Sequence, residues 1–249
     1  DILSLNVRIR IVIQTIAVVI SLIILGGLKK FDTGFYMIEN TWLLTILAFF
    51  GIIWFINLYN FIDGIDGYAA SEAIFISLSV FVLFGDSIML SFAFIVSGFL
   101  LLNWQKAKIF MGDTGSTFLG FTFGIYAVFY QNSEKSSLVV WIILASLFWF
   151  DATLTLIRRF INKENISTPH KKHTYQRVVK TGFSHRKTVL FSMMINCICL
   201  LLAFFGVQKA VLLIPALMIN VILLYIVVRM VDSKINGVQR SANKILNNS

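Results

Sequence analysis

Long apolar stretches alternate with short polar connections along the whole chain. Windows of about 19 residues, the length that crosses a bilayer as a helix, find eight of these stretches. They lie near 9–28, 41–57, 68–84, 87–103, 115–131, 137–157, 188–206 and 210–228. Backbone groups in hydrocarbon must bond to one another, and the stretches lack the apolar and polar alternation of barrel strands, so we expect helices. The pattern predicts an all-α, polytopic integral membrane protein with about eight transmembrane helices.

The composition agrees with a bilayer as the surrounding solvent. Of the 249 residues, 58% are hydrophobic and 13% are charged, which is far from the mixture found in a water-soluble domain. We expect a single transmembrane domain over 1–249, with 230–249 as a basic cytoplasmic tail. Only residues 85–87 separate the third and fourth stretches, which predicts a tight helical hairpin.

Positive charges are sorted between two sets of connections. If successive helices cross the membrane, one face receives 1–10, 57–67, 103–114, 158–187 and the tail from 229. The other face holds only Lys29, Lys30, Lys135 and Lys209 of the 21 lysines and arginines. The positive-inside rule makes the first face cytoplasmic. Topology and anionic headgroups then account for the net charge of +9, and we expect membrane lipids rather than nucleic acid as partners.

Amide and acidic side chains gather at the end of the second apolar stretch, on the cytoplasmic face. Asn57, Asn60 and Asp63 follow at intervals of three residues and share roughly one side of a helix. Two glycines then let the backbone turn and a ligand approach closely, and Asp66 adds a second carboxylate. A capped helix end with solvated aspartates is the alternative explanation. The density of polar groups within apolar sequence favours a binding site.

A second polar cluster occupies 103–116. Asp113 immediately precedes the fifth apolar stretch, so it could act only as a helix cap. The surrounding glycines and hydroxyl groups would also offer N–H groups and a favourable helix dipole to a phosphate, with Lys106 and Lys108 adding positive charge. A carboxylate beside a phosphate is repulsive unless a cation lies between them. Asp113 therefore implies Mg²⁺, with Mn²⁺ as the alternative ion, bridging carboxylates and a pyrophosphate.

Histidines and cations occupy the longest cytoplasmic connection. His170 and His173 lack a third ligand nearby, so phosphate or nucleotide recognition fits better than zinc. His185 is equally well explained as a solvated loop residue. Asp151 lies inside the sixth stretch, where a carboxylate costs about 2–3 kcal/mol and needs a partner. Arg158 shares its helical face, so an internal ion pair and a role in the site are both open.

Three strings, NLYNFIDGIDG, KIFMGDTGS and HKKHTYQ, occur in this order on one face. With the number and polarity of the apolar stretches, they resemble the bacterial polyprenyl-phosphate N-acetylhexosamine-1-phosphate transferase family. Members of that family start the synthesis of O-antigen, enterobacterial common antigen, wall teichoic acid and peptidoglycan lipid intermediates. The first residues, DILSLNVRIRIVIQ, are similar to the segment after the family's paired aspartates, with Asp1 matching the second. The resemblance implies that the first aspartate and about three upstream spans are missing.

The resemblance implies Mg²⁺-dependent chemistry in the bacterial inner membrane, with the active site facing the cytoplasm. A polyprenyl phosphate attacks the β-phosphorus of a UDP-sugar, which gives a polyprenyl-diphospho-sugar and UMP. The resemblance implies a role for each matching position. Asp113 and Asp63 would be metal ligands, Asp63 and Asp66 would position metal, donor or nucleophile, and Asp1 would activate the acceptor. The implied substrate contacts are His173 with the diphosphate or sugar, Phe110 stacked on uracil, Asn60 and Asn103 with the nucleoside, and Asn57, Lys108 and Arg158 as further contacts.

The last string departs from the family at two positions. Tyr175 and Gln176 stand where members that use UDP-GlcNAc or the muramoyl-pentapeptide donor carry histidines. This departure indicates the O-antigen or capsule branch, whose donors are often 6-deoxy-N-acetylhexosamines. Two other classes stay open. One is a membrane transporter, whose ionisable residues would lie near the midplane, often in paired repeats, and the other is an inactive fragment of the transferase.

Overall fold

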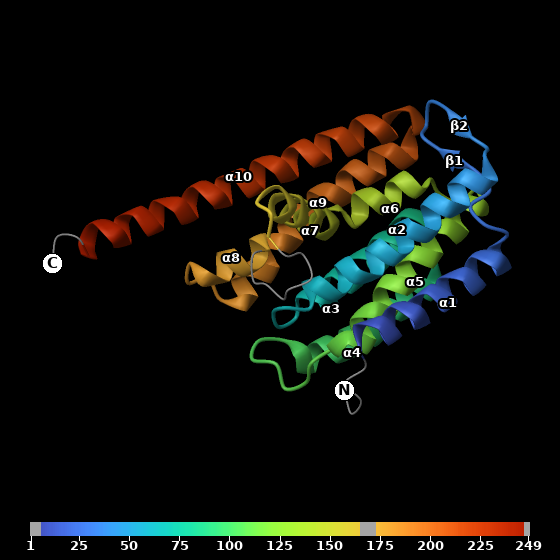
Figure 1. Cartoon of the computed structure of the whole chain (residues 1–249). Helices are drawn as coiled ribbons and strands as arrows, with labels where there is room; N and C mark the ends of the chain where they lie inside the picture. Colours follow the sequence, from blue (N-terminus) through green and yellow to red (C-terminus); the bar gives the residue numbers. More distant parts are fainter. Residues whose placement is uncertain (1–5, 165–172, 247–249) are drawn as a thin grey trace.

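The computed structural model describes residues 6–164 and 173–246, which are almost entirely helical (Figure 1). The predicted all-α class is confirmed. The α-helices are α1 (Val7–Leu25), α2 (Thr41–Ile62), α3 (Tyr68–Phe84), α4 (Ser87–Asn103), α5 (Gly112–Asn132), α6 (Leu138–Leu144), α7 (Ser146–Ile161), α8 (Thr174–Lys180), α9 (His185–Gln208) and α10 (Leu213–Leu246). A 3-10 turn at Ala210–Leu212 and a short hairpin of β1 (Phe31–Asp32) and β2 (Met37–Ile38) join them.

Polar side chains between the apolar stretches determine where helices begin and end. The Asp86 carboxylate accepts the N–H groups of Ile88 and Met89 (2.8 and 3.1 Å) and so begins α4. Because α3 ends at Phe84 and α4 begins directly after this cap, the helical hairpin expected around 85–87 is confirmed. At the other extreme, α10 continues to Leu246. The tail expected from 230 therefore begins as an extension of the last helix.

The number of membrane spans is smaller than predicted. Within the described residues, four helical segments are long and apolar enough to cross a bilayer: Arg8–Leu25, Thr41–Ile62, His185–Gln208 and Ala210–Ile235. The helices α6 and α7 would together supply a fifth, but they are bent by 76° at their junction. With 17 residues each, α3 and α4 reach about 25 Å against a hydrocarbon core of about 30 Å. The expectation of about eight spans is wrong, because apolar windows register neither bends nor short lengths. In addition, α5 is 21 residues long but is not among the helices apolar enough to cross a bilayer.

The outer surface of the bundle is apolar. On α1, the side chains of Ile16, Ile20, Ile23 and Ile24 are more than half exposed. A continuous aliphatic surface of this kind is unfavourable in water and suits contact with lipid tails. Together with the long apolar helices, it identifies a multi-pass membrane protein.

The core forms around α2, which packs most extensively against α5. Gly120 of α5 comes so close to α2 that an added Cβ would lie 2.9 Å from the Ile56 Cα. The fully buried ring of Tyr59 fills the next turn of α2. Since interiors of this density resist displacement, the packing fixes the ends of α2 and α5, which carry Asp63 and Asp113, relative to each other.

The connections sort to two opposite ends of the bundle (Figure 1). At one end, the Lys29 N–H donates to the Asn132 side chain (3.0 Å) and the Ser137 hydroxyl donates to the Asp32 carbonyl (2.6 Å). At the other end, 57–67 and 103–114 meet α8 and the start of α9. This second end is called the polar end below. The predicted gathering of these connections is confirmed, and their side of the membrane stays a prediction.

Candidate active site

Asn103 joins the loop after α2 to the loop after α4 at the polar end. Gly67 precedes α3 with a φ of 76°, a conformation that glycine adopts readily. Its N–H donates to the Asn103 Oδ1 (3.0 Å), and the Asn103 Nδ2 donates to the Ile109 carbonyl (2.8 Å). Asn103 is buried with both ends of its amide engaged, so it holds the loop after α2 against the loop after α4. Its contact with a nucleoside stays a prediction.

Asp66 brings a third segment to the same place. Its Oδ2 accepts the Ala107 N–H (3.3 Å) and lies 3.3 Å from Nδ1 of His185. The Asp66 N–H donates to the same ring nitrogen (3.3 Å). Asp66 thus ties the loops that follow α2 and α4 to the start of α9. From the sequence, His185 was equally well explained as a solvated loop residue. Its contact with Asp66 was therefore not predicted.

Asp63 and Asp113 form the acidic centre of the polar end. Asp63 ends α2, and Asp113 lies in the first turn of α5. Burial raises the pKa of Asp63 to about 6, the Gly112 N–H opposes this rise, and the charge of Asp113 adds to it. The two negative charges repel each other unless a cation is shared between them. The arrangement is therefore suited to holding a cation.

The residues present fit Mg²⁺ bound jointly with a phosphate. The Asp113 carboxylate already pairs with a cation, the Arg10 guanidinium from α1. No group of three or more His, Cys, Asp or Glu side chains able to hold a metal occurs among residues 6–164 and 173–246. Mg²⁺ is commonly held by one or two carboxylates, with substrate phosphates and water completing its shell. Asp63 and Asp113 match that pattern rather than a cage made by protein alone.

The amides of α2 also have protein partners. The Asn60 Oδ1 accepts the Ser116 hydroxyl (2.6 Å) and so joins α2 to the first turns of α5. The Asn57 Nδ2 donates to the Ile53 carbonyl (2.7 Å) and to the Gln14 side chain of α1 (3.4 Å). Both amides set the spacing of α1, α2 and α5 around Asp113. Their contacts with substrate stay predictions.

His173 is buried beside the Asp63 loop. Its exposed fraction is 4%, and its ring centroid lies 6.1 Å from that of Phe61 and 5.9 Å from that of Tyr175. Burial lowers the pKa of His173 to about 4, and the Arg159 charge adds to the lowering. The ring is therefore neutral at physiological pH. A neutral imidazole can still form a hydrogen bond with a phosphate or sugar hydroxyl.

Asp151 holds the segment that begins with His173. Both of its oxygens accept the Thr174 N–H (3.0 Å each), and one lies 3.8 Å from the His173 Nδ1. Arg158 pairs instead with Asp232 of α10 (2.9 Å). The ion pair considered between Asp151 and Arg158 is therefore not formed, because a neighbouring segment supplies a better-placed donor.

The α4–α5 loop presents two predicted substrate residues on its surface. Phe110 is 77% exposed, and Lys108 is also exposed. An exposed aromatic ring next to a cation is suited to stacking on a nucleobase while the cation meets a phosphate. Asp1 and His170 lie outside the described residues, so their predicted roles stay predictions.

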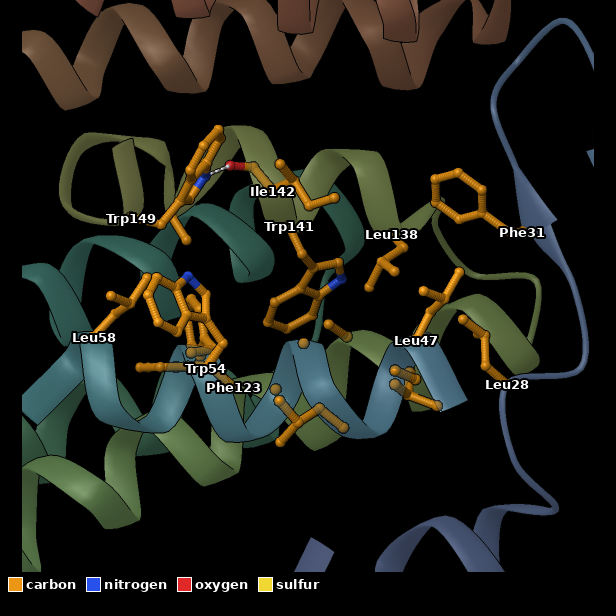
Figure 2. Close-up of a pocket in the computed structure, with 18 of the residues that line it drawn as sticks. Leu28, Phe31, Leu47, Trp54, Leu58, Phe123, Leu138, Trp141, Ile142 and Trp149 are labelled. Atoms are coloured by element: carbon orange, nitrogen blue, oxygen red, sulfur yellow. Dashed lines mark hydrogen bonds between the residues drawn. The ribbon is translucent and has the colours of Figure 1, made fainter. Parts of the chain in front are cut away.

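An apolar pocket of about 410 Å³ runs along α2 toward the polar end (Figure 2). Leu44 lines it at the start of α2 and Leu58 near its end, and α5, α6 and α7 close the other sides. In Figure 2 the side chains of Trp54, Trp141 and Trp149 surround this space. Leu58 precedes Asn60 by two residues and Asp63 by five. On α2 the described lining reaches Leu58 and does not include Asp63 of the acidic centre.

The model of glycosyl transferase family 4 matches residues 1–131. This match covers more than half of the chain and includes Asp63, Asp66 and Asp113. The chain belongs to glycosyl transferase family 4. The resemblance to this family is thereby confirmed, and two of the three sequence strings lie within the matched residues.

Curated relatives in bacteria are similar to this family 4 chain. The probable undecaprenyl-phosphate N-acetylglucosaminyl 1-phosphate transferase of Bacillus subtilis is 38% identical over 169 residues, 64% of this chain and 47% of the relative. The undecaprenyl-phosphate alpha-N-acetylglucosaminyl 1-phosphate transferase of Thermotoga maritima is 31% identical over 59% of this chain and 49% of the relative. The protein of the same description in Escherichia coli K12 is 28% identical over 83% of this chain and 60% of the relative. The chain spans about half the length of the curated relatives it matches.

Two contributors to the site of this family 4 protein, Arg10 and Asp232, have no distinctive signal in the sequence. Arg10 resembles the other positive charges that topology explains, yet it reaches Asp113, 103 residues later. Asp232 lies at the start of the basic tail, yet it pairs with Arg158, 74 residues earlier. Ser116 and Asn60 lie in two of the strings singled out in the sequence, but the strings alone do not show that the Ser116 hydroxyl donates to Asn60. A motif search limited to short strings finds none of these pairs, because only the fold brings them together.

Proposed function

We propose that this family 4 membrane protein transfers an N-acetylhexosamine 1-phosphate from a UDP-sugar to undecaprenyl or a related polyprenyl phosphate, releasing UMP. The observation that carries the proposal is the pairing of Asp63 and Asp113 at the polar end of a bundle whose long helices are apolar enough to cross a bilayer. The reaction joins a lipid nucleophile to a water-soluble donor, so it needs a charged centre at an apolar boundary. The names of the relatives, which are undecaprenyl-phosphate sugar 1-phosphate transferases, support the same reaction.

In the proposed reaction, an oxygen of the acceptor phosphate attacks the β-phosphorus of the donor. A phosphorus–oxygen bond forms there, the bond from the β-phosphorus to the bridging oxygen breaks, and its electron pair leaves with UMP. Mg²⁺ bound by Asp113 and Asp63 would neutralise charge on the diphosphate. Arg10 lies beside Asp113 and would donate to the same phosphate oxygens. The hydrogen bonds between the loops after α2 and α4 would hold these groups in place before the substrates arrive, so less ordering is needed at the moment of reaction.

The substrates would approach from different directions. The apolar pocket would take the first part of the polyprenyl chain and direct its phosphate to the acidic centre. The donor would lie over the exposed α4–α5 loop, with Phe110 on uracil and Lys108 and Arg158 on the phosphates. His173 would bind the diphosphate or sugar as a neutral ring, and Asp66 would position the loop between these groups.

The proposed location is the cytoplasmic face of a bacterial inner membrane. Cations concentrate in the connections of the polar end, as the positive-inside rule requires of a cytoplasmic face. The pair Tyr175 and Gln176 favours a role in O-antigen or capsule synthesis. Both assignments agree with a donor that is made in the cytoplasm.

The proposal is tested by transfer from radiolabelled UDP-sugars in membranes that contain the protein, undecaprenyl phosphate and Mg²⁺. We expect label in the lipid extract and its loss when a chelator removes Mg²⁺. A panel of UDP-N-acetylhexosamines and their 6-deoxy forms identifies the donor. Label that collects as free sugar inside vesicles indicates a transporter instead. An absence of lipid-linked label with every donor rejects transfer by this chain.

A further inference from the structure

Asp232 reaches the polar end from α10, outside the residues of the family match. On α10, Leu224, Val228 and Asp232 follow at intervals of four residues and therefore share one face. Leu224 and Val228 are buried against the bundle, and α10 packs on α7, α8 and α9. Asp232 lies on the same, inward face of α10. A carboxylate in this position at a membrane boundary is unfavourable unless it is paired.

The Asp232 carboxylate is paired twice. Its Oδ2 accepts from the Arg158 Nη2 on α7 (2.9 Å), and its Oδ1 accepts from the Arg177 Nη1 on α8 (2.7 Å). Within residues 6–164 and 173–246, neither guanidinium has a second hydrogen-bond acceptor. A guanidinium has five N–H donors. Most donors of both arginines thus stay available to an anion.

The arginine pair lies next to His173. Arg177 follows His173 by four residues, on the helix that Asp151 holds through the Thr174 N–H. Both arginines are close enough to Asp151 to act on it electrostatically. The oxygens of Asp151 already bond to Thr174 and lie near His173, so Asp151 does not occupy either guanidinium. A phosphate group beside His173 would therefore find two partly exposed guanidinium groups.

We propose that Asp232 is a positioning residue that holds Arg158 and Arg177 side by side as a site for the diphosphate of the donor. The inference rests on the proposed function, because the diphosphate is that of the UDP-sugar. Planar guanidinium groups fixed at one end can present parallel N–H donors to phosphate oxygens. A diphosphate has enough oxygens to engage both arginines. The last helix thereby becomes part of the substrate site.

The test compares Asp232→Asn and Asp232→Glu with the control Glu134→Gln. Glu134 pairs with Lys30 at the opposite end of the bundle, so the control also breaks an ion pair but leaves the polar end unchanged. Calorimetric titration of the purified protein with UDP and Mg²⁺ measures binding, and transfer assays measure KM and kcat. We expect Asp232→Asn to weaken UDP binding and raise the donor KM about tenfold, with kcat nearly unchanged. Asp232→Glu should recover most of the affinity, and Glu134→Gln should change neither quantity.

A double-mutant comparison separates positioning from simple stabilisation. Arg177→Gln should weaken UDP binding less in the Asp232→Asn protein than in the unmodified protein, because the two side chains act together. Unchanged UDP affinity in Asp232→Asn, with only a lower melting temperature, overturns the inference and leaves the proposed reaction intact. Weaker UDP binding by Asp232→Asn in a protein that transfers no sugar phosphate supports the arginine site and overturns the proposed reaction.

Discussion

The Tyr175 hydroxyl donates a hydrogen bond of 2.7 Å to the carbonyl oxygen of Phe61, two residues before Asp63. Burial raises the pKa of Tyr175 far above its ordinary value, so the hydroxyl keeps its proton. The ring of the same side chain lies nearly parallel to that of His173. An added Cβ at Gly64 would lie 2.5 Å from the hydroxyl oxygen. One tyrosine thus links His173 to the loop that carries Asp63.

We expect Tyr175→Phe to loosen this link without emptying the space that the ring fills. The Phe61 carbonyl loses its donor, which should lower the free energy of unfolding by about 1 kcal/mol. The value of kcat/KM should fall about threefold to tenfold as Asp63 loses its fixed position. Transfer assays and thermal denaturation check both values. Tyr36→Phe, which changes a well-exposed tyrosine on the opposite hairpin, should leave both unchanged.

The Asp113 carboxylate is expected to be essential because it carries the charge that holds Mg²⁺. Asp113→Asn keeps the size of the side chain and removes its charge. Activity should fall by on the order of a hundredfold or more, since a metal ion stabilises the transition state by several kcal/mol. The amount of folded protein in the membrane should stay near normal. Near-normal turnover across a Mg²⁺ titration would reduce Asp113 to a structural partner of Arg10, and Asp32→Asn on β1 is the matched control.

The raised pKa of Asp63 predicts how stability depends on pH when Mg²⁺ is removed. The pKa is about 6 in the folded protein against an ordinary value of 3.8, so the folded state binds the proton more tightly. Ionised Asp63 therefore opposes folding fully above pH 6, and the penalty disappears as pH falls toward 4. We expect Asp63→Asn to raise stability by about 1–2 kcal/mol at pH 8, after allowance for solvent screening. At pH 4 it should raise stability by much less.

Thermal denaturation in a chelator at pH 8 and pH 4 measures this difference. Asp32→Asn controls for the exchange of an acid for an amide at the far end of the bundle. A melting temperature of Asp63→Asn that exceeds that of the unmodified protein equally at both pH values would show that the effect does not come from ionisation of Asp63.

The apolar pattern located the helices but not the bend between α6 and α7. Hydrocarbon requires apolar side chains and internally bonded backbone, and both requirements are visible in a sequence. A bend instead needs a partner for the freed backbone groups. Here the Asn220 side chain of α10 donates to the Ile143 carbonyl and to the Ser146 hydroxyl (3.4 and 2.7 Å). That partner lies more than 70 residues away, so no window over 137–157 could reveal it.

The same distinction separates the predicted and missed features of the site. Acids and glycines in apolar sequence indicated that 57–67 and 103–114 form a site, because polar groups at a membrane boundary are costly unless they bind a partner. The sequence could not show whether an amide faces a ligand or the protein. Asn103 illustrates the difference, since its buried side chain bonds to two loops. Likewise, Asp151 accepts a hydrogen bond from the Thr174 N–H, whereas the sequence spacing suggested an ion pair with Arg158.

His173 and His170 can be distinguished by mutation, although their chemistry in the sequence is equivalent. The match to the family string selects His173, and the structure buries it between Phe61 and Tyr175. If a donor phosphate bonds to this ring, His173→Ala should lower kcat/KM about tenfold to hundredfold, or about 1.5–3 kcal/mol. His170→Ala should cost much less. Transfer assays give kcat/KM, and the amount of folded protein in the membrane is measured in parallel.

A second variant keeps the comparison clear, because His173→Ala also leaves a cavity between two rings. His173→Gln retains a neutral hydrogen-bonding group and should recover part of the lost activity. Its pH profile between pH 5 and 8 should have the same shape as that of the unmodified protein, since a ring with a pKa of about 4 does not titrate in this range. A changed profile would show that His173 acts as a charged group. Equal losses in the two alanine variants, or a loss only in His170→Ala, would show that the wrong histidine was matched to the family string.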